Sequence, residues 1–462
     1  MSSLHLVPDR LFPAEPSTRA IARELYALVA DLPILSPHGH VDPRLLLDDT
    51  EFSDPATLFI RNDHYVTRLL HAAGIGLERL GLGQREPNTD PREVWRIFCA
   101  HWHLFAGTAS GYWLSTELAE LFGIDEQPSS KSADRIFDKI AAQLTQPAFR
   151  PRALFGQFGI EVLATTDDPL DDLAAHTALA TDPGFSGRVL PTFRPDAYLD
   201  PSTAGFAERI ERLRATSYAS YLDALAERRQ HFIRAGAVSA DHGVVEPYTV
   251  DLSESEASAL FARALTGTLE APEARAFRGH MLVEMARMSV DDGLVMTVHA
   301  GVRRNHSTAT FERFGPDTGH DLPVATSFVD NLRPLLERFG TVPDFHLVLF
   351  SLDESTYSRE LAPLAGFYPS VYVGAPWWFL DAPDAALRFR AAVTETAGFY
   401  RGSGFIDDTR AFLSIPARHD MARRLDSAFL ARLVGEGRLD RSTAERVAVD
   451  LVDAIPRKAF KL

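Results

Sequence analysis

The sequence predicts an α/β fold, a (β/α)8 TIM-type barrel built as one domain over residues 1–462. Three observations support this prediction. Short runs rich in Val, Ile, Leu and Thr alternate with longer segments of helical periodicity, which is typical of strand–helix units around a parallel sheet. There are eight such runs, the number that closes a barrel. Most of them end in His, Asp or Arg, at the place where barrel enzymes carry their chemistry.

The eight predicted strands follow the chain in order. They are residues 32–40, 161–168, 188–196, 235–243, 294–301, 346–353, 371–379 and 404–410. About 120 residues separate the first two strands, more than one crossover helix needs, so we expect an insertion at about 44–150. Apolar residues at helical spacing in EVWRIFCAHWHLFAG and ADRIFDKIAAQL predict that this insertion is helical. Two closing helices are expected at 418–440 and 442–455.

Composition limits the function. The formal net charge of −16 disfavours nucleic acid and anionic membranes as partners, because both attract clustered positive charge. The single cysteine, Cys99, excludes an intrachain disulfide and a thiolate metal cluster, and the amino terminus shows no secretory signal pattern. We therefore expect a soluble cytoplasmic protein that acts on a small molecule. The sequence leaves open whether it forms a homo-oligomer.

The stretch SPHGHVDP predicts a metal site at the end of the first strand. Alternate residues of a strand share one face, so His38 and His40 project the same way. The first and last strands of a closed barrel are neighbours, and Asp408 from the last run is the expected third ligand, with Asp407 as the alternative. Nitrogen and oxygen ligands suit one divalent transition metal, with zinc as the first expectation.

The fourth and fifth strands offer further candidates. The four lysines, at 131, 139, 458 and 461, lie outside the predicted strands, which disfavours a lysine-bridged pair of metals and leaves a mononuclear site. The fourth strand ends instead in Asp241 and His242. His299, at the end of the fifth, is either an additional ligand, a hydrogen-bond partner of the substrate or a structural residue.

Nine local motifs have a recognisable order. They are HGH at 38–40, NDHY at 62–65, TTDDP at 165–169, FRPD at 193–196, SADHG at 239–243, VHAG at 298–301 with Arg304 and Asn305 after it, GPDTG at 315–319, WWF at 377–379 and DDTRAFLSIPARHD at 407–420. A barrel that begins with His-x-His and ends with Asp resembles the amidohydrolase superfamily, and these motifs resemble its uronate isomerase (glucuronate isomerase) branch. The sequence departs from the family in HGHVDP, where a cysteine and leucine are usual, and in Val66 and Thr67, where Lys-Trp is common.

The resemblance implies an aldose–ketose isomerase acting on a hexuronate, from D-glucuronate to D-fructuronate, from D-galacturonate to D-tagaturonate, or both. Tyr65 and Asp408 resemble the proton-handling pair of the family, and His64 is expected to hold a substrate hydroxyl. A phenol ionises near pH 10, so Tyr65 is expected to donate or relay the proton.

A uronate carries a carboxylate, and arginine binds carboxylates by paired hydrogen bonds. The expected substrate-binding residues are Arg194, Arg304, Arg410, Asp241, His299 and Trp377. Arg68 is a weaker candidate, and a structural salt bridge is the alternative for each arginine. Of Trp377 and Trp378, one is expected to plug the barrel. Two other functions remain open: a metal-dependent hydrolase or lactonase acting on a sugar-derived acid, and a silent barrel that binds sugar acids.

Overall fold

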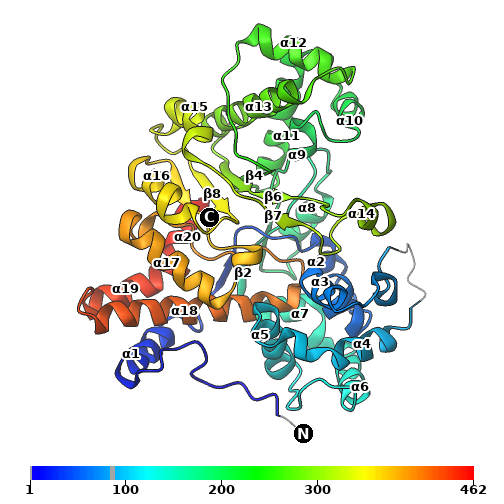
Figure 1. Ribbon diagram of the computed structural model, residues 1–462, viewed down its shortest axis with the longest axis vertical. Coiled ribbons are helices and arrows are strands. Elements are labelled where there is room, and N and C mark those ends of the chain that lie inside the picture. Colours follow the sequence, from blue (N-terminus) through cyan, green and yellow to red (C-terminus); the bar gives the residue numbers. More distant parts are fainter. Residues whose placement is uncertain (1–2, 84–88) are drawn as a thin grey trace.

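The computed structural model describes residues 3–83 and 89–462 and has a mixed α/β fold with parallel strands at its centre and helices around them (Figure 1). Seven of the eight predicted runs contain a strand. These are β1 (Ile34–Ser36), β2 (Ile160–Ala164), β3 (Arg188–Leu190), β4 (Ser239–Val244), β5 (Val295–Ala300), β8 (Leu347–Ser351) and β9 (Val371–Val373). They form two parallel sheets, in the orders β1-β2-β3 and β4-β5-β8-β9.

The two sheets adjoin at the carboxyl end of β3. Phe193 forms parallel bridges to Asp167 beyond β2 and to Ala240 of β4. A short antiparallel pair follows β5, made of β6 (Val302–Arg303) and β7 (Leu322–Pro323). The strand order therefore follows the order of the chain, as strand–helix repeats require.

The eighth run, 404–410, is not a strand, and the prediction of a regular strand there is wrong. Gly404 has φ +75° and Asp408 has φ +41°, and two left-handed residues interrupt an extended backbone. The segment still lies between its expected neighbours, because Gly402 bridges Val373 in parallel and the His40 amide donates to the Thr409 carbonyl at 3.0 Å.

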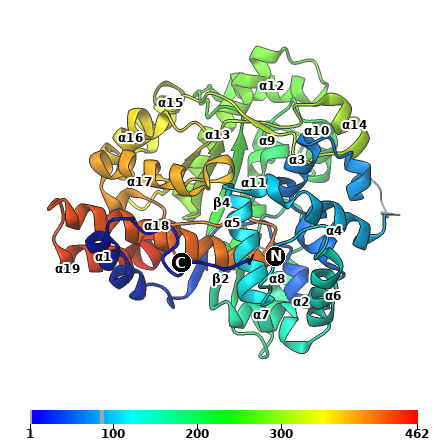
Figure 2. The ribbon, with the colours of Figure 1, turned by 60° about the horizontal axis from the view of Figure 1, so that its bottom comes forward.

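The segment between β1 and β2 is largely helical where the structure describes it, and its helices gather on one side of the molecule (Figures 1 and 2). They are α2 (Pro43–Asp48), α3 (His64–Ala72), α4 (Pro91–Ala100), α5 (Ala109–Thr116), α6 (Ala133–Leu144) and α7 (Pro151–Gln157). Buried residues such as Val94, Trp95 and Ile136 give these helices an apolar cluster that extends to β1 and β2.

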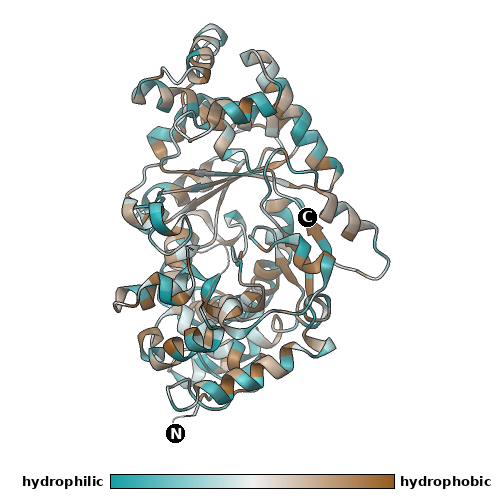
Figure 3. Ribbon diagram, turned by 90° about the vertical axis from the view of Figure 1, so that its right-hand side faces the viewer, coloured by the Kyte–Doolittle hydropathy of each residue, from teal (hydrophilic) through white to brown (hydrophobic). Residues whose placement is uncertain are grey.

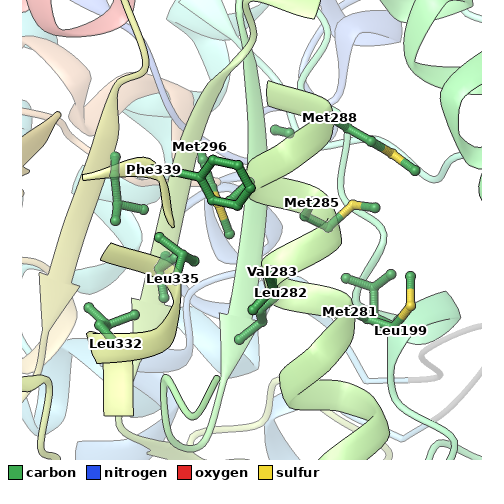
Figure 4. Close-up of a cluster of buried hydrophobic side chains, with 14 of the residues drawn as sticks. Leu199, Met281, Leu282, Val283, Met285, Met288, Met296, Leu332, Leu335 and Phe339 are labelled. Atoms are coloured by element: carbon green, nitrogen blue, oxygen red, sulfur yellow. The ribbon is translucent and has the colours of Figure 1, made fainter. Parts of the chain in front are cut away.

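The remaining connections carry helices that cover the strands. They are α8 (Ala174–Thr181), α9 (Asp196–Leu199), α10 (Phe206–Arg212), α11 (Tyr218–Arg234), α12 (Glu254–Leu265), α13 (Ala271–Asp292), α14 (Thr308–Phe314), α15 (Val329–Phe339), α16 (Ala362–Phe367) and α17 (Pro383–Ala397). The largest apolar cluster lies between these helices and the sheet of β4. In Figure 4, Met285 of α13, Leu335 and Phe339 of α15 and Met296 of β5 meet in it.

Three helices close the carboxyl end, where two were predicted: α18 (Ile415–Gly435), α19 (Arg441–Val452) and α20 (Ala454–Phe460). The amino-terminal α1 (Pro16–Ala27) packs on α18 and α19. Hydropathy follows this arrangement, since the central strands are apolar and the outer helices are mixed (Figure 3). In the described part of the chain, no helix is both long and apolar enough to cross a bilayer.

Candidate active site

The HGH turn after β1 is held in place by both of its neighbours. The Thr166 hydroxyl, just beyond β2, donates to the Gly39 carbonyl at 2.7 Å. On the other side, the His40 amide donates to the Thr409 carbonyl. The backbone that carries His38 and His40 is therefore fixed by hydrogen bonds from the neighbouring segments.

The structure brings Asp408, and not Asp407, to the two imidazoles. The Asp408 Oδ1 lies 3.0 Å from the His40 Nε2 and 3.5 Å from the His38 Nε2. Asp407 faces the other way and accepts from the His419 Nε2 at 3.1 Å. The left-handed backbone at Asp408 is a strained conformation that the surrounding contacts must maintain, and such strain is common at functional sites.

His38, His40 and Asp408 fit a divalent metal. Their ligand atoms all lie within 4.8 Å of one another. Burial lowers the pKa of His38 to about 4. Burial alone would raise the pKa of Asp408, but the hydrogen bond with His40 and the charges of His38 and His40 hold that pKa well below its usual range. At neutral pH the chain thus offers a neutral His38 imidazole and a carboxylate, the protonation states that metal binding requires.

A second group of ligand atoms shares His38 with the first and contains Asp241 and His299. The His299 Nδ1 lies 2.6 Å from the Asp241 Oδ1, and its ring stacks between Phe350 and His38 with centroids 4.1 and 4.5 Å away. Among the described residues, the buried His299 Nε2 has no hydrogen-bond partner. His242 belongs to neither of the two groups found in the described part of the chain, and its Nδ1 contacts the Thr297 carbonyl at 2.9 Å. All four lysines lie outside the strands, as predicted.

A cavity next to the HGH turn is lined by most of the predicted site residues. Its wall consists of His40, Asn62, Asp63, His64, Tyr65, Arg194, Arg304, Trp377, Trp378, Asp408, Thr409, Arg410, Ala411 and Arg418. Of the predicted site residues, His38, Asp241 and His299 are buried and do not line it. Sequence reasoning missed Arg418 as a member of this wall, although it lies in the motif at 407–420 that carries part of the family resemblance.

The NDHY motif forms the start of α3 and aims two side chains at the cavity. Asp63 is the N-cap, and its carboxylate accepts from the Tyr65 amide at 2.8 Å, a local contact that short polar residues favour. His64 stacks on Tyr65 with centroids 4.8 Å apart. Burial, assisted by the positive charge of Arg410, lowers the pKa of His64 to about 3. Burial raises the pKa of Tyr65, so the phenol is protonated at neutral pH.

The three predicted arginines all line the cavity, and each also has a carboxylate partner. Arg194 Nε lies 3.0 Å from Asp196 and 3.5 Å from Asp241. The other two pair with the loop that contains GPDTG: Arg304 with Asp321 and Arg410 with Asp317, both at 3.0 Å. A guanidinium has five N–H donors, so one ion pair leaves donors for a substrate carboxylate.

Both tryptophans line the cavity in different surroundings. Trp377 is buried and packs edge-on against His299, with centroids 4.7 Å apart. Trp378 has a left-handed backbone and lies between His64 and the Arg304 guanidinium, which is 4.9 Å from its ring centroid. The packing of Trp377 resembles a plug, while Trp378 belongs to the charged wall.

A larger cavity, of about 390 Å³, lies elsewhere. Ile34 and Gly159, at the amino ends of β1 and β2, form part of its wall. Active sites of parallel α/β enzymes lie at the carboxyl ends of the strands. Among the described residues, both groups that can hold a metal lie near the smaller cavity, which is therefore the candidate active site.

The carboxyl ends of the parallel strands and the segments that follow them bring together two imidazoles, a carboxylate and three arginines. This defines the class first: an α/β enzyme whose His/Asp cluster has the ligand atoms for one metal ion. Comparison with known proteins then identifies the family. A family model described as glucuronate isomerase matches residues 17–455, and the chain belongs to this family. The resemblance inferred from the motifs is thereby confirmed.

Relatives match over their whole length. The chain is 52% identical to the uronate isomerase of Corynebacterium efficiens, covering 100% of both chains, and 50% identical to that of Brucella suis biovar 1, covering 99% of this chain and 100% of the relative. Among solved structures, the glucuronate isomerase from Caulobacter crescentus has a TM-score of 0.97 at 50% identity, covering 100% of this chain and 98% of that one. The uronate isomerase from Thermotoga maritima has a TM-score of 0.92 at 27% identity, covering 99% of each.

A putative metal-dependent hydrolase from Lactobacillus casei is similar with a TM-score of 0.56 at 16% identity, over 95% of this chain and 97% of that one. At this identity the likeness is one of fold alone. It does not favour the hydrolase alternative.

Proposed function

We propose that this enzyme interconverts an aldose and a ketose form of a hexuronate, D-glucuronate with D-fructuronate, D-galacturonate with D-tagaturonate, or both. One observation carries the proposal: a phenol, an ionised carboxylate and three arginines face a single cavity beside a metal-binding cluster. The family to which the chain belongs supports it. The arginines suit the carboxylate of the sugar acid, and the other groups suit movement of a proton between neighbouring carbons.

The proposed mechanism assigns one task to each group. Arg410 and Arg304 bind the substrate carboxylate, and the neutral His64 accepts or donates a hydrogen bond to a hydroxyl. Asp408, ionised at neutral pH, is the base that takes the proton from the carbon beside the carbonyl. Tyr65 carries a proton that it can deliver to the substrate oxygen or to the adjacent carbon. A divalent metal held by His38, His40 and Asp408, zinc in our proposal, would polarise the substrate carbonyl.

A closed ring of strands would explain why these groups, which come from both ends of the chain, lie around one cavity. We propose that the segment 404–410 closes a single barrel domain between β9 and β1. The bridge from Val373 to Gly402 and the hydrogen bond from His40 to Thr409 support this arrangement. A cytoplasmic location and a homo-oligomeric state stay predictions.

The direct test measures both candidate activities on the purified enzyme. Incubation with D-glucuronate and D-galacturonate should yield keto sugar, and incubation with aldonolactones and uronolactones should release no acid above the uncatalysed rate. Lactone hydrolysis without isomerisation would overturn the proposal. The ratio of the two isomerisation rates identifies the preferred hexuronate.

Isotope exchange tests the route of the proton. In deuterium oxide, proton transfer through an enediol should place deuterium on one face of the new C–H centre, observed by NMR. If the product contains no solvent deuterium even after prolonged equilibration, the enediol route is excluded and a hydride shift is favoured.

A further inference from the structure

Arg418 is a buried charge in the wall of the cavity with no part in the metal cluster or in the proposed carboxylate contacts. It comes from α18, and only 1% of its surface is exposed. Burying an ion costs several kcal/mol unless other groups compensate it. The compensating groups are the Asp381 Oδ2 at 3.1 Å, the Ser414 Oγ at 3.0 Å and the Asp407 carbonyl at 3.4 Å. The guanidinium is therefore fixed in position.

Two aromatic rings hold the same guanidinium from the other sides. It stacks on Trp113 of α5, with its central carbon 3.6 Å from the ring centroid. It lies 5.4 Å from the centroid of Tyr65, and the rings of Trp113 and Tyr65 meet edge to face at 5.8 Å. A cation over an aromatic face is attracted to it, most strongly where water is excluded. Two helices of the insertion, α3 and α5, thus meet α18 at one cation.

We propose that Arg418 is a positioning residue that holds the Tyr65 ring in the orientation in which its phenol exchanges a proton during catalysis. This inference rests on the proposed isomerase function.

The charges that face Tyr65 support this role. Burial raises the pKa of the phenol, and the carboxylates of Asp381, Asp408 and Asp63 raise it further. Among the side chains, Arg418 is the main positive charge that acts against them. His64, stacked on the ring, is neutral at neutral pH, and Arg68 lies one helical turn along α3. Without Arg418 the buried phenol would lose this opposing charge.

Asp381 holds the Arg418 guanidinium in place without cancelling the effect of its positive charge on Tyr65. Burial raises the pKa of Asp381 to about 7 despite the contact with Arg418, so this carboxyl is only partly ionised near neutral pH. A fully ionised partner would neutralise the guanidinium more completely. The pair therefore leaves Arg418 with much of its positive field at Tyr65.

A double-mutant cycle separates this role from a purely structural one. Arg418→Met should lower kcat by about tenfold to a hundredfold in the wild-type background, the range expected for weakening a positioned acid or base. In a Tyr65→Phe background the same change should cost less than about threefold, because the phenol that Arg418 serves is gone. Equal losses in both backgrounds would overturn the proposal. Arg418→Lys should restore part of the activity, since it keeps a charge.

The pH dependence gives a second readout. In Arg418→Met the guanidinium is lost, and the limb of the pH profile in which kcat changes with ionisation of Tyr65 should move to higher pH. Trp113→Leu retains the ion pair but removes the stacking surface, and it should shift the limb in the same direction by a smaller amount. It also serves as the test variant if Arg418→Met fails to fold. An unshifted limb in a folded variant contradicts the proposal.

A measurement without substrate distinguishes failure of this inference from failure of the proposed function. A fluorinated tyrosine placed at position 65 can be titrated by ¹⁹F NMR in the presence and absence of Arg418. The phenol should ionise at higher pH in Arg418→Met, whatever the reaction of the enzyme. An identical midpoint in both proteins would overturn the inference even if isomerase activity is found.

Discussion

The buried floor beneath the cavity, formed by the HGH turn and Asp408, and the charged mouth, formed by Arg304 and Arg410, are held in place in opposite ways. On the floor, the His38 side chain is 2% exposed and the turn that carries it is tied to two neighbouring segments. At the mouth, Arg304 and Arg410 are 45% and 41% exposed and are held by aspartates from one loop. The floor is held by buried backbone contacts, and the mouth by ion pairs that water can weaken.

The difference in burial matches a difference in role: the floor is expected to bind the metal, and the mouth is expected to bind the substrate. Metal ligands need fixed geometry, and buried hydrogen bonds between segments provide it. A carboxylate-binding arginine must instead accept a new partner, and the partly exposed guanidinium groups of Arg304 and Arg410 leave N–H donors open to one. Changes on the floor should therefore affect metal binding and turnover together, while changes at the mouth should affect substrate binding and leave the metal in place.

The largest expected effect comes from removing a metal ligand on the floor. His38→Ala should reduce bound metal from about one ion per chain to a small fraction, because two ligands hold an ion poorly. Turnover should fall about a thousandfold, equivalent to several kcal/mol of stabilisation of the transition state. Elemental analysis and kinetics measure both. His242→Gln is the matched control, since His242 lies outside both ligand groups, and it should retain the metal. Full metal content in His38→Ala would refute the site.

At the mouth, Arg410→Lys should reduce kcat/KM by about tenfold to a hundredfold, since an ammonium cannot reproduce a two-pronged contact. Metal content and Tm should stay at the wild-type values. Arg313→Lys is the control, because Arg313 is exposed and outside the cavity wall. Loss of metal in Arg410→Lys would show that mouth and floor are not independent.

A smaller effect is expected from the hydroxyl that holds the HGH turn. Thr166→Val removes the hydrogen bond to the Gly39 carbonyl with little change in shape. The dissociation constant of the metal, measured by chelator competition, should rise about tenfold, the usual cost of losing a contact that orients a ligand. Thr166→Ser keeps the hydroxyl and should bind metal as the wild type does. Unchanged metal affinity in Thr166→Val would mean that the hydrogen bond from the His40 amide to the Thr409 carbonyl is enough to fix the turn.

The smallest effect concerns stability against pH. Burial lowers the pKa of His64 to about 3, so the folded protein keeps this imidazole neutral. Above pH 6.5 the residue is neutral in both states. As pH falls from 6.5 toward 3, the unfolded chain binds the proton and the folded chain does not, so stability is lost, on the order of 1 kcal/mol per pH unit. His64→Asn should reduce this acid sensitivity in urea unfolding between pH 7 and 5. Identical slopes would show that His64 is protonated in the folded protein.

The sequence by itself determined the features that depend on neighbouring residues. The SPHGHVDP stretch identified His38 and His40 as a ligand pair, although they lie in a turn just beyond β1 and not in the strand itself. The length between the first two strands predicted the insertion, and helical periodicity predicted that it is helical. The seven strands followed from the same local pattern. The family motifs added the candidate roles of Tyr65 and Arg410.

Tertiary structure decided what depends on distant segments. The choice of Asp408 over Asp407 follows from left-handed backbone angles at Gly404 and Asp408, which also prevent the regular strand predicted at 404–410. Strand alternation assumes an extended backbone at every residue, so it does not include these angles. Arg418 is 353 residues from Tyr65 in sequence, and only folding brings its guanidinium to that ring. Burial, which sets the proton affinities of His38, His64 and Tyr65, is likewise a property of the assembled fold and is absent from the extended chain.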